Sequence, residues 1–364
     1  MMKALTYIEP GVIKYQTVEK PKLLEPTDVI GKTVLTTICG SDLHFWRGAF
    51  PETNALAKKN GTRGVILGHE GLIKVEKVGP EVKNFKPGDI CIVSCVSSCG
   101  HCYYCEEGCE AHCAENGGDC GCILGHEIDG TQAEYIRVPL ADTSLYKCPE
   151  GIPLESLLML SDILPTSYEL GVRDGGVKEG STVAIVGLGP IGLAALLSAK
   201  ALKPAYIVAI DLDDTRLELA KKLGADYTIN PKKEDPVSFV MKLPINRKGK
   251  QPGVDTAIEC VGSPTTFELC QKLVGMNGII ANVGVHSKPT NLEMERLWIM
   301  NIKITTGLVN TNSTPELLKK VVDGDLDPSP LITHHFKLSE VEKAYEVFKN
   351  ASESHAIKIV LTPD

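Results

Sequence analysis

Four closely spaced cysteines have the residue type and spacing of a closed metal site. Cys99, Cys102, Cys105 and Cys113 are separated by two, two and seven residues. Thiolates in this pattern can surround one tetrahedral Zn²⁺ and leave no open position, which is typical of a structural zinc site. Cys109 could substitute for Cys113, and a reactive thiol cluster or an iron–sulfur site is the alternative.

A second candidate site begins at Cys39, where an expected strand ends. Ser41 and His44 follow two and five residues later. This pattern would suit a thiolate that binds a metal, next to a hydroxyl and an imidazole that pass a proton. A buried thiol beside a surface turn explains the same residues equally well.

The pentapeptide Ile-Leu-Gly-His-Glu occurs twice, ending at Glu70 and at Glu127. Either His-Glu pair could bind a metal. The first copy lies about one β-hairpin after Cys39 and opens a strand, whereas the second continues into a turn. We therefore expect His69 and Glu70 to belong to the site, and His126 to be an ordinary loop histidine.

A carboxylate interrupts an apolar stretch further along the chain. Asp162 lies within Leu158–Leu164, where Ser161 is the other polar residue. Burying a carboxylate is costly unless it is paired or bound to a metal. Asp162 is therefore a third candidate ligand, and the alternative is an N-cap for a helix that continues toward Leu170. Thr166 lies one helical turn further on.

A dinucleotide-binding pattern occupies the middle of the chain. Residues 182–186 form a β-branched apolar run, and Gly-Leu-Gly-Pro-Ile-Gly follows at 187–192. A helix is expected up to residue 202, and the next apolar run, 206–210, ends in Asp211. Strand, glycine turn, helix, strand and acid in this order predict a nucleotide-binding unit.

Each glycine of this turn has its own expected role. Gly187 would allow the tight turn, Gly189 would let the backbone approach a pyrophosphate, and Gly192 would let helix and strand pack closely. The helix N-terminus would supply unpaired N–H groups for the phosphates, and Asp211 would accept the ribose hydroxyls. A purely structural glycine turn is the alternative.

The rest of the sequence indicates two domains around these sites. Residues 3–38 contain short strand signals broken by prolines and acids, which favours an antiparallel or barrel-like region. Residues 51–63 are polar and predict a loop, whereas residues 153–170 predict a helix. Strands alternate with helices from 182 to 308, which indicates a doubly wound parallel sheet. The tail, 314–364, is expected to pack on the first domain.

Composition limits the classes of protein that the chain can represent. Its 364 residues exceed one typical core. The 38 basic and 46 acidic residues give a net charge of −8 without a basic cluster, so we expect no nucleic-acid partner. No apolar run reaches the ~18 residues that span a bilayer, and no secretion signal is evident, so we expect no membrane contact and a cytoplasmic location. Thirteen cysteines in such a chain favour metal or thiol chemistry over disulfides.

Together these motifs resemble the zinc-containing medium-chain alcohol dehydrogenases over nearly the whole chain. The resemblance rests on Cys39-Gly-Ser-Asp-Leu-His44, Gly68-His-Glu70, the four-cysteine lobe, Asp162 with Thr166, the glycine turn with Asp211, and Leu331-Ile-Thr-His-His335.

The resemblance implies an α/β fold with two parts. A GroES-like β-rich catalytic domain would span residues 1–163, with a structural zinc lobe at 95–122. A Rossmann doubly wound parallel sheet would span residues 164–308, and the C-terminal segment, 309–364, would return to the catalytic domain.

Matching positions in the family imply roles for single residues. Cys39, His69 and Asp162 match the catalytic zinc ligands, and the four cysteines match the structural site. Among the remaining catalytic candidates, Ser41 and His44 match a proton relay, Glu70 matches an acid that binds the metal directly in some members, and Thr166 accompanies Asp162. The cofactor contacts match Gly187, Leu188, Gly189, Pro190, Ile191, Gly192, Asp211, Arg216, Val261, Val283, Val285 and Lys358, of which Lys358 falls where the family often has a basic residue toward the pyrophosphate.

The resemblance further implies reversible, NAD-linked oxidation of a small alcohol to a ketone or aldehyde. One catalytic and one structural Zn²⁺ are expected per subunit of a homodimer or homotetramer, with Lys303–Leu308 as the edge strand that pairs between subunits. Asp162 stands where the liver and yeast enzymes have cysteine and resembles secondary-alcohol dehydrogenases, so a secondary alcohol is the expected substrate. A polyol, sugar or L-threonine dehydrogenase is the first alternative, and a non-catalytic zinc or redox protein is the second.

Overall fold

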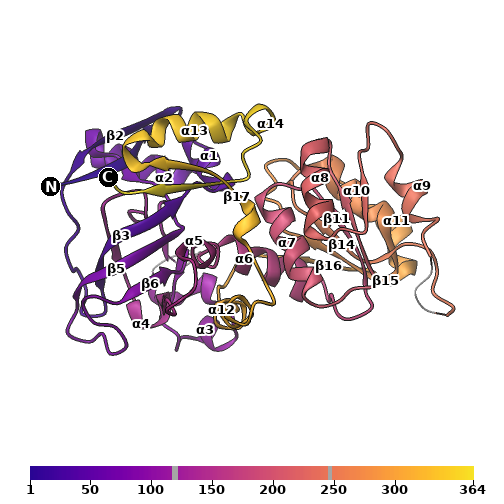
Figure 1. Cartoon of the computed structure of the whole chain (residues 1–364), viewed down its shortest axis with the longest axis horizontal. Coiled ribbons are helices and arrows are strands. Elements are labelled where there is room, and N and C mark those ends of the chain that lie inside the picture. Colours follow the sequence, from indigo (N-terminus) through magenta and orange to yellow (C-terminus); the bar gives the residue numbers. More distant parts are fainter. Residues whose placement is uncertain (117–121, 245–247) are drawn as a thin grey trace. The chain divides into compact units, whose positions relative to one another are not determined.

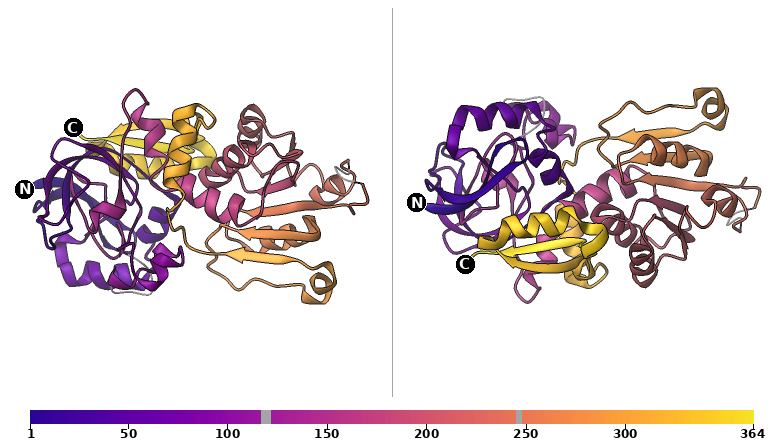
Figure 2. Two further views of the ribbon diagram at one scale, coloured as in Figure 1. Left: turned by 90° about the horizontal axis from the view of Figure 1, so that it is seen from below. Right: turned by 90° about the horizontal axis from the view of Figure 1, so that it is seen from above.

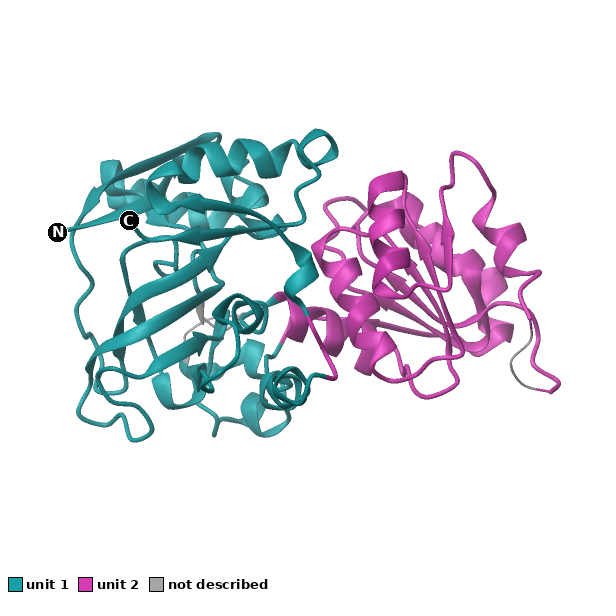
Figure 3. Cartoon of the chain, viewed as in Figure 1, with its two compact units in different colours: residues 1–162, 310–324, 328–364 teal, residues 163–309, 325–327 magenta. Residues whose placement is uncertain are grey.

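The computed structural model describes residues 1–116, 122–244 and 248–364 (Figure 1). The chain divides into two compact units (Figure 3). Unit 1 comprises residues 1–162, 310–324 and 328–364, and unit 2 comprises residues 163–309 and 325–327. The cysteine and His-Glu motifs belong to unit 1, and the glycine turn belongs to unit 2.

Antiparallel pairing dominates unit 1, as its short strand signals predicted. One sheet has the order β2 (Val12–Val18), β1 (Met2–Glu9), β4 (Val65–Ile66). The larger sheet has the order β10 (Leu145–Lys147), β6 (Ile90–Val93), β5 (Gly71–Val78), β3 (Val29–Thr37), β18 (Lys358–Thr362), β17 (Ile332–Lys337), and β9 (Tyr135–Val138) also pairs with β3. A short pair joins β7 (Val96–Ser97) to β8 (Cys122–Ile123).

The C-terminal strand lies beside the strand that leads to Cys39. Strand β18 runs antiparallel to β3, with Val360 opposite Thr37, and β17 runs parallel to β18. Figure 2 shows these yellow strands next to the indigo and purple elements of unit 1. The tail therefore completes the sheet that carries the candidate metal ligands.

Short helices connect the strands of unit 1. They are α1 (Gly40–Trp46), α2 (Pro51–Asn60), α3 (Tyr103–Glu106), α4 (Ala141–Ser144), α5 (Leu154–Leu158), α12 (Thr314–Asp323), α13 (Val341–Lys349) and α14 (Ala351–Ser354).

Helix α2 shows that the loop expected over residues 51–63 is wrong. Pro51 occupies the first turn, where a missing N–H leaves no helical bond unmade. Glu52 near the N-terminus, and Lys58 near the C-terminus, complement the helix dipole. Only Thr53 and Ala57 of this helix are buried, so its apolar stripe is too narrow to show in the sequence pattern.

The helix expected over residues 153–170 is interrupted at the candidate ligand. Helix α5 ends at Leu158, and the next helical residues, α6 (Ile163–Thr166), begin only after Asp162. Ser161 Oγ donates to the Leu158 carbonyl at 2.5 Å, which stabilises the turn between the two helices. The interruption lets Asp162 leave the helical path and contact Cys39.

Unit 2 is the doubly wound parallel sheet that the sequence predicted. Its strand order is β13 (Tyr227–Ile229), β12 (Tyr206–Ile210), β11 (Thr182–Val186), β14 (Val254–Glu259), β15 (Val274–Asn282), β16 (Lys303–Thr306), and all neighbouring strands are parallel. This 3-2-1-4-5-6 order is that of dinucleotide-binding folds. The main connecting helices are α7 (Pro190–Lys200), α8 (Asp214–Leu223), α9 (Pro236–Val240), α10 (Pro264–Leu273) and α11 (Met294–Leu297) (Figures 1 and 2).

Each unit has an apolar core of its own. In unit 1, Leu5, Tyr7 and Ile38 pack with Tyr345 of α13, and in unit 2, Ile210 and Ile280 belong to a cluster of buried apolar residues. Over the described part of the chain, no helix combines the length and apolar character needed to cross a membrane.

Candidate functional site

Four side chains of unit 1 converge on one point. One ligand atom from each of Cys39, His69, Glu70 and Asp162 lies within 4.8 Å of the other three. Cys39 Sγ is 3.5 Å from Asp162 Oδ2, and His69 Nε2 is 3.3 Å from the same oxygen. The sequence analysis grouped these four residues from three separate stretches of the chain.

Three local structures bring the four side chains together. Strand β3 ends two residues before Cys39, which is the N-cap of α1. Strand β5 pairs antiparallel with β3 and begins directly after His69 and Glu70, so both pairs of residues meet at one end of the sheet. The interruption after α5 supplies Asp162.

The electrostatics of this cluster suit a bound cation. Burial raises the pKa of the Cys39 thiol, and the nearby Asp162 carboxylate adds to the shift. Burial also raises the pKa of Glu70. Burial alone would lower the pKa of His69, yet Cys39 and Asp162 raise it well above its ordinary value. Several buried anionic groups without water are unfavourable, and a divalent cation among them would relieve the repulsion.

The donor set matches the chemistry of Zn²⁺. Thiolate, imidazole and carboxylate are its usual protein ligands, and three protein ligands leave one position for a substrate. Glu70 Oε2 is buried and has no hydrogen-bond partner within the described residues. It is therefore a fourth oxygen or sulfur or nitrogen atom in this group that a metal ion could bind. Cys39, His69 and Asp162 therefore fit a catalytic zinc site.

Asp42 lies behind the ring of His69, a placement that the sequence analysis did not predict. Its Oδ1 lies 3.6 Å from His69 Nδ1, and its Oδ2 accepts a hydrogen bond from the Cys39 backbone N–H at 2.9 Å. A carboxylate at Nδ1 leaves Nε2 of the ring for a metal. The available signal was the position of Asp42 three residues after Cys39, where an acid closes a capping box.

Lys358, for which the resemblance implied a place toward the pyrophosphate, lies beside the metal cluster in unit 1. Its side chain is fully buried, and Nζ lies 2.6 Å from Glu70 Oε1 and 3.3 Å from the Ile38 carbonyl oxygen. The pairing of β18 with β3 carries the ammonium to the metal cluster. Because one oxygen of Glu70 is held by Lys358, only Oε2 is left for any further interaction.

The expected proton relay lies on α1. Ser41 Oγ is 3.4 Å from His69 Nε2, the nitrogen that faces the cluster. His44 is half-buried on the next turn of the same helix. Burial lowers the pKa of His44, and Arg47 lowers it further, so the imidazole is neutral at neutral pH and can accept a proton.

The four-cysteine lobe forms a second group of ligand atoms. Its sulfurs lie within 4.8 Å of one another, with 3.6 Å between Cys102 and Cys105 and 3.9 Å between Cys99 and Cys105. Backbone N–H groups donate to the sulfurs, and that of Ala114 is the main cause that lowers the pKa of Cys102 to about 6. The fourth member is Cys113, and Cys109 is not in the group among the described residues. Four thiolates fit a structural zinc site with no open position.

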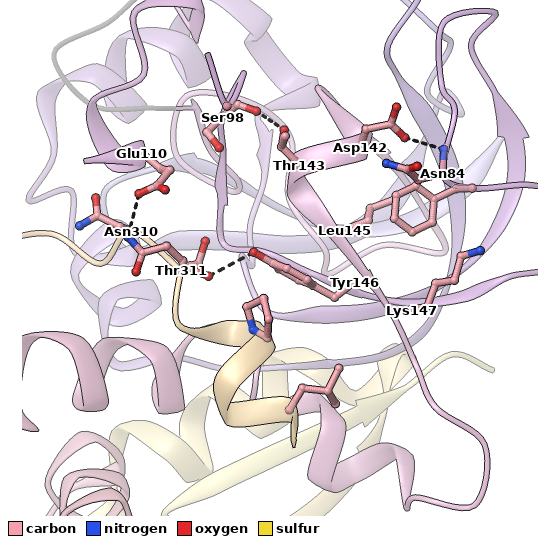
Figure 4. Close-up of a pocket in the computed structure, with 15 residues that line it drawn as sticks. Asn84, Ser98, Glu110, Asp142, Thr143, Leu145, Tyr146, Lys147, Asn310 and Thr311 are labelled. Atoms are coloured by element: carbon pink, nitrogen blue, oxygen red, sulfur yellow. Dashed lines mark hydrogen bonds between the residues drawn. The ribbon is translucent and has the colours of Figure 1, made fainter. Parts of the chain in front are cut away.

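A cavity of about 730 Å³ lies beside this lobe rather than at the Cys39 cluster (Figure 4). Polar groups on its wall are bonded to one another, since Tyr146 Oη donates to the Thr311 carbonyl at 3.2 Å and Asn312 donates to Glu110 at 3.0 Å. Its lining contains none of the Cys39-cluster residues, so we do not assign it as the substrate pocket.

The glycine turn of unit 2 has the geometry that its spacing predicted. Gly187 has a φ of +93°, and a Cβ there would lie 2.3 Å from a Val261 methyl group. A Cβ on Gly192 would lie 1.8 Å from the Gly187 carbonyl oxygen, so helix α7 and strand β11 require the glycine. A Cβ on Gly189 would meet no atom within 4 Å, which leaves the backbone open to a ligand.

Most of the other expected cofactor residues follow the carboxyl ends of the strands. Asp211 follows β12 and accepts hydrogen bonds from the backbone N–H of Leu188 at 2.6 Å and of Asp213 at 2.9 Å. Val261 follows β14 and Val285 follows β15, and their exposed fractions are 51% and 62%. Parallel strands end at one edge of the sheet, where such folds bind nucleotides. The remaining cofactor candidates are Pro190 and Ile191 at the start of α7, Arg216 on α8 and Val283 after β15. Thr166, a catalytic candidate, lies on α6.

Glu259, which the sequence analysis did not assign, shapes this edge. The buried carboxylate accepts hydrogen bonds from the N–H groups of Val261 and Gly262 at 3.0 Å and from Thr266 at 2.6 Å. Its second oxygen lies 3.5 Å from His286. Glu259 therefore fixes the two loops that follow β14 and β15, and an acid at a strand end was the only signal for it.

Two family models match the chain. The alcohol dehydrogenase GroES-like domain matches residues 25–150, and the zinc-binding dehydrogenase model matches residues 190–323. An alcohol dehydrogenase from Cupriavidus necator is 32% identical over 379 residues, which cover 100% of this chain and 99% of the relative. The chain belongs to the zinc-containing medium-chain alcohol dehydrogenase family.

Further relatives agree with this membership. The apo form of zinc dependent alcohol dehydrogenase 2 from Streptococcus pneumonia, a solved structure, has 48% identity and a TM-score of 0.90, covering 100% of this chain and 99% of that one. An L-threonine 3-dehydrogenase from Pyrococcus abyssi is 31% identical over 89% of this chain and 88% of its own length. The expected GroES-like and Rossmann fold is confirmed, and the dehydrogenase is a zinc-dependent, NAD-linked oxidoreductase.

Proposed function

We propose that this dehydrogenase reversibly oxidises a small secondary alcohol to a ketone, and that its metal ligands are Cys39, His69 and Asp162. The observation that carries the proposal is the buried convergence of these three side chains. A carboxylate binds Zn²⁺ at about 2.0–2.2 Å and a thiolate at about 2.3 Å, so Asp162 is less bulky than a cysteine at the same position. The reduced bulk supports space for a second alkyl group on the reacting carbon.

The residues of unit 1 have separate tasks in this proposal. When bound, Zn²⁺ acts as a Lewis acid that lowers the pKa of the substrate hydroxyl, and NAD accepts the hydride. Ser41 lies beside the metal-facing nitrogen of His69 and accepts the proton that the substrate releases. The neutral His44 carries that proton onward. Lys358 favours the ionised form of Glu70, which opposes the effect of burial, and binds one of its two oxygens.

Steady-state kinetics with ethanol and propan-2-ol test the substrate class. We expect the kcat/KM for propan-2-ol to exceed that for ethanol. A preference for ethanol would contradict the secondary-alcohol assignment and would leave the metal and cofactor assignments unaffected. The matched pair Cys39→Ser and Cys102→Ser tests the metal roles, because the first should abolish turnover in a folded protein and the second should mainly reduce stability.

One observation favours a second substrate class, an alcohol with another polar group near the hydroxyl. His126 is 7% exposed, and neither ring nitrogen has a partner among the described residues. Its ring packs against Phe45 at 5.1 Å and Phe50 at 5.3 Å between centroids. Burial lowers the pKa of His126, the Glu52 carboxylate opposes the shift, and His69 adds to it. The backbones of the two repeats are close, since a Cβ on Gly125 would lie 2.7 Å from the Gly68 nitrogen.

An unpaired buried imidazole is unfavourable unless a ligand or water bonds to it. A hydroxyl or ammonium group of the substrate would supply that bond, and the relative from Pyrococcus abyssi is named for an amino acid that has such a group. Comparing propan-2-ol, butane-2,3-diol, sorbitol and threonine separates the two classes. His126→Gln should lower kcat/KM for the diol or amino alcohol only. An equal change for propan-2-ol would argue against substrate contact.

We also propose that NAD is preferred over NADP. The 2′-phosphate of NADP would approach the Asp211 carboxylate, whose orientation two backbone N–H groups fix. Like-charge repulsion of this kind costs on the order of 1–3 kcal/mol, roughly ten- to hundredfold in kcat/KM. Equal values for the two cofactors would contradict the role given to Asp211.

A homodimer or homotetramer is the proposed assembly, and a cytoplasmic location is proposed with it. Strand β16 is the edge of the parallel sheet, and Met294, Trp298 and Ile299 near it have exposed fractions of 54%, 67% and 66%. An exposed strand edge next to apolar side chains supports pairing with a second copy across a two-fold axis. Light scattering at micromolar concentration should give at least a dimer, and a monomer would refute the assembly.

A further inference from the structure

A chain of polar side-chain contacts, two of them hydrogen bonds, connects the metal cluster to helix α13 of unit 1. It begins where Asp42 Oδ1 lies 3.6 Å from His69 Nδ1. The other oxygen of Asp42 accepts a hydrogen bond from Gln132 Nε2 at 3.1 Å. Gln132 Oε1 in turn accepts one from the Tyr345 hydroxyl at 2.8 Å. Three side chains distant in sequence thus line up behind one proposed zinc ligand.

The direction of each bond follows from the acceptors around Gln132. Its amide nitrogen faces both Asp42 Oδ2 and the Thr37 carbonyl oxygen, the latter at 3.1 Å. The Thr37 carbonyl oxygen can only accept, so the NH₂ group must point at it and Oε1 must point at Tyr345. Burial raises the pKa of Tyr345 well above its ordinary value, so its hydroxyl keeps the proton that it donates.

The three side chains behind His69 are inaccessible to solvent. Asp42, Gln132 and Tyr345 each have an exposed fraction of 0%. The Gln132 backbone is held on both sides, because its N–H donates to Leu67 and its carbonyl accepts from Leu5, each at 2.9 Å. Water cannot replace a lost partner here, so removing one group leaves the next one unsatisfied.

We propose that Gln132 and Tyr345 are positioning residues that act through Asp42 to fix the ring of His69 for the catalytic zinc. The Tyr345 hydroxyl sets the orientation of the Gln132 amide, and the amide holds Asp42 with one oxygen toward Nδ1. The ring then presents Nε2 to the cluster, as partners behind metal-bound histidines generally do. This inference rests on the proposed ligand role of His69.

Tyr345→Phe removes one hydroxyl from the chain, and Tyr7→Phe is the matched control. Tyr7 is likewise 0% exposed, packs in the same core as Tyr345, and donates one hydrogen bond, to Asn54 at 2.5 Å. The control therefore has the same loss of a buried hydroxyl without a link to Asp42. The affinity of the catalytic zinc, measured with a competing chelator, is the readout.

Loss of a partner behind a ligand typically weakens metal affinity about 10–100-fold, which we expect for Asp42→Asn. Tyr345→Phe acts one link further away and should weaken it about three- to tenfold by the same mechanism. Tyr7→Phe should lower thermal stability to a similar extent and leave the zinc affinity unchanged. Equal zinc affinities in Tyr345→Phe and Tyr7→Phe would show that Tyr345 is only structural.

Combining Tyr345→Phe with Asp42→Asn tests whether the effect passes through Asp42. We expect Tyr345→Phe to have no further effect on zinc affinity once Asp42 is changed, because coupled residues are non-additive. Independent, multiplying effects would overturn the chain as drawn. Zinc content and propan-2-ol turnover of the unaltered protein separate failure of the proposed function from failure of this inference. Absence of zinc at the Cys39 cluster would contradict both proposals. Normal zinc content and turnover, with equal zinc affinities in the two tyrosine variants, would contradict the positioning role alone.

Discussion

The same pentapeptide, Ile-Leu-Gly-His-Glu, occupies two places in unit 1, and its histidines have opposite properties. The pKa of His69 is raised well above its ordinary value because Cys39 and Asp162 outweigh the effect of burial. The pKa of His126 is lowered, mainly because burial excludes water from its ring. Identical local sequence therefore produces either a candidate metal ligand or a neutral buried imidazole.

The two copies are also neighbours in space. A Cβ on Gly125 of the second copy would lie 2.7 Å from the backbone nitrogen of Gly68 in the first. Gly130, just after the second copy, donates its N–H to the Ile66 carbonyl at 2.9 Å. The glycines thus let the two backbones pack closely, and the difference between the histidines depends on the side chains that each one faces.

The largest expected effect comes from exchanging each histidine for glutamine. His69→Gln should remove the catalytic zinc, and with it several kcal/mol of transition-state stabilisation, or about a thousandfold or more in kcat/KM. His126→Gln should keep both zinc ions and most of the turnover of propan-2-ol. Metal analysis and steady-state kinetics on the two purified variants measure the contrast. Loss of a zinc ion in His126→Gln would reverse the assignment.

Sequence reasoning could predict the part of this contrast that depends on spacing. A cysteine, a His-Glu pair and an acid in family order identified Cys39, His69 and Asp162 before any contact was known. The sequence could not give the environment of His126, because Phe45 and Phe50 come from helix α1 and the turn before α2, and the polar stretch 51–63 gave no helical pattern. The contact of Lys358 with Glu70 could not be predicted for the same reason, since the pairing of β18 with β3 is a long-range contact.

Regular elements were easier to predict than single contacts. The alternation of apolar runs and helices fixed the parallel sheet of unit 2, and the glycine positions fixed its phosphate turn. The roles of Asp42, Gln132 and Glu259 could not be predicted, because an isolated polar residue has no periodic signal and its role depends on which buried group it faces. Burial and hydrogen-bond partners supplied that information.

The second prediction concerns Asp162. This carboxylate contacts His69 but not His126. Asp162→Ala should remove the catalytic zinc and leave the four-cysteine lobe loaded, because the two groups share no ligand. Asp162→Cys should keep both zinc ions and change turnover, since the charge is preserved and the donor is larger. Zinc content should therefore fall from two to one per subunit only in the alanine variant. Loss of both ions there would contradict separate sites.

The third prediction compares the two glutamates of the repeats. Lys358→Met leaves Glu70 buried without its ion pair, and breaking a buried pair in this way costs about 3–5 kcal/mol. Glu127 is only partly buried, so Glu127→Gln should change stability by about 1 kcal/mol or less. Urea unfolding of both variants measures the difference. Similar losses in the two variants would mean that Lys358 and Glu70 are not a buried pair in solution.

The smallest expected effect is the pH dependence that His126 adds to stability. Its pKa is lower in the folded state than the ordinary value of about 6.5, because burial among Phe45 and Phe50 disfavours the charged ring. The unfolded chain therefore binds a proton more readily than the folded one, and stability falls as pH decreases from about 6.5 toward the folded pKa. Above that window the contribution is constant.

His126→Gln removes the titrating group, so the difference in unfolding free energy between this variant and the unaltered protein should shift in favour of the variant only below about pH 6.5. Parallel urea titrations at pH 7.5 and pH 5.5 measure this shift, with His355→Gln as the control because His355 is an exposed histidine of the same unit. A shift of equal size in both variants, or one that appears only at alkaline pH, would show that His126 is not held neutral by its surroundings.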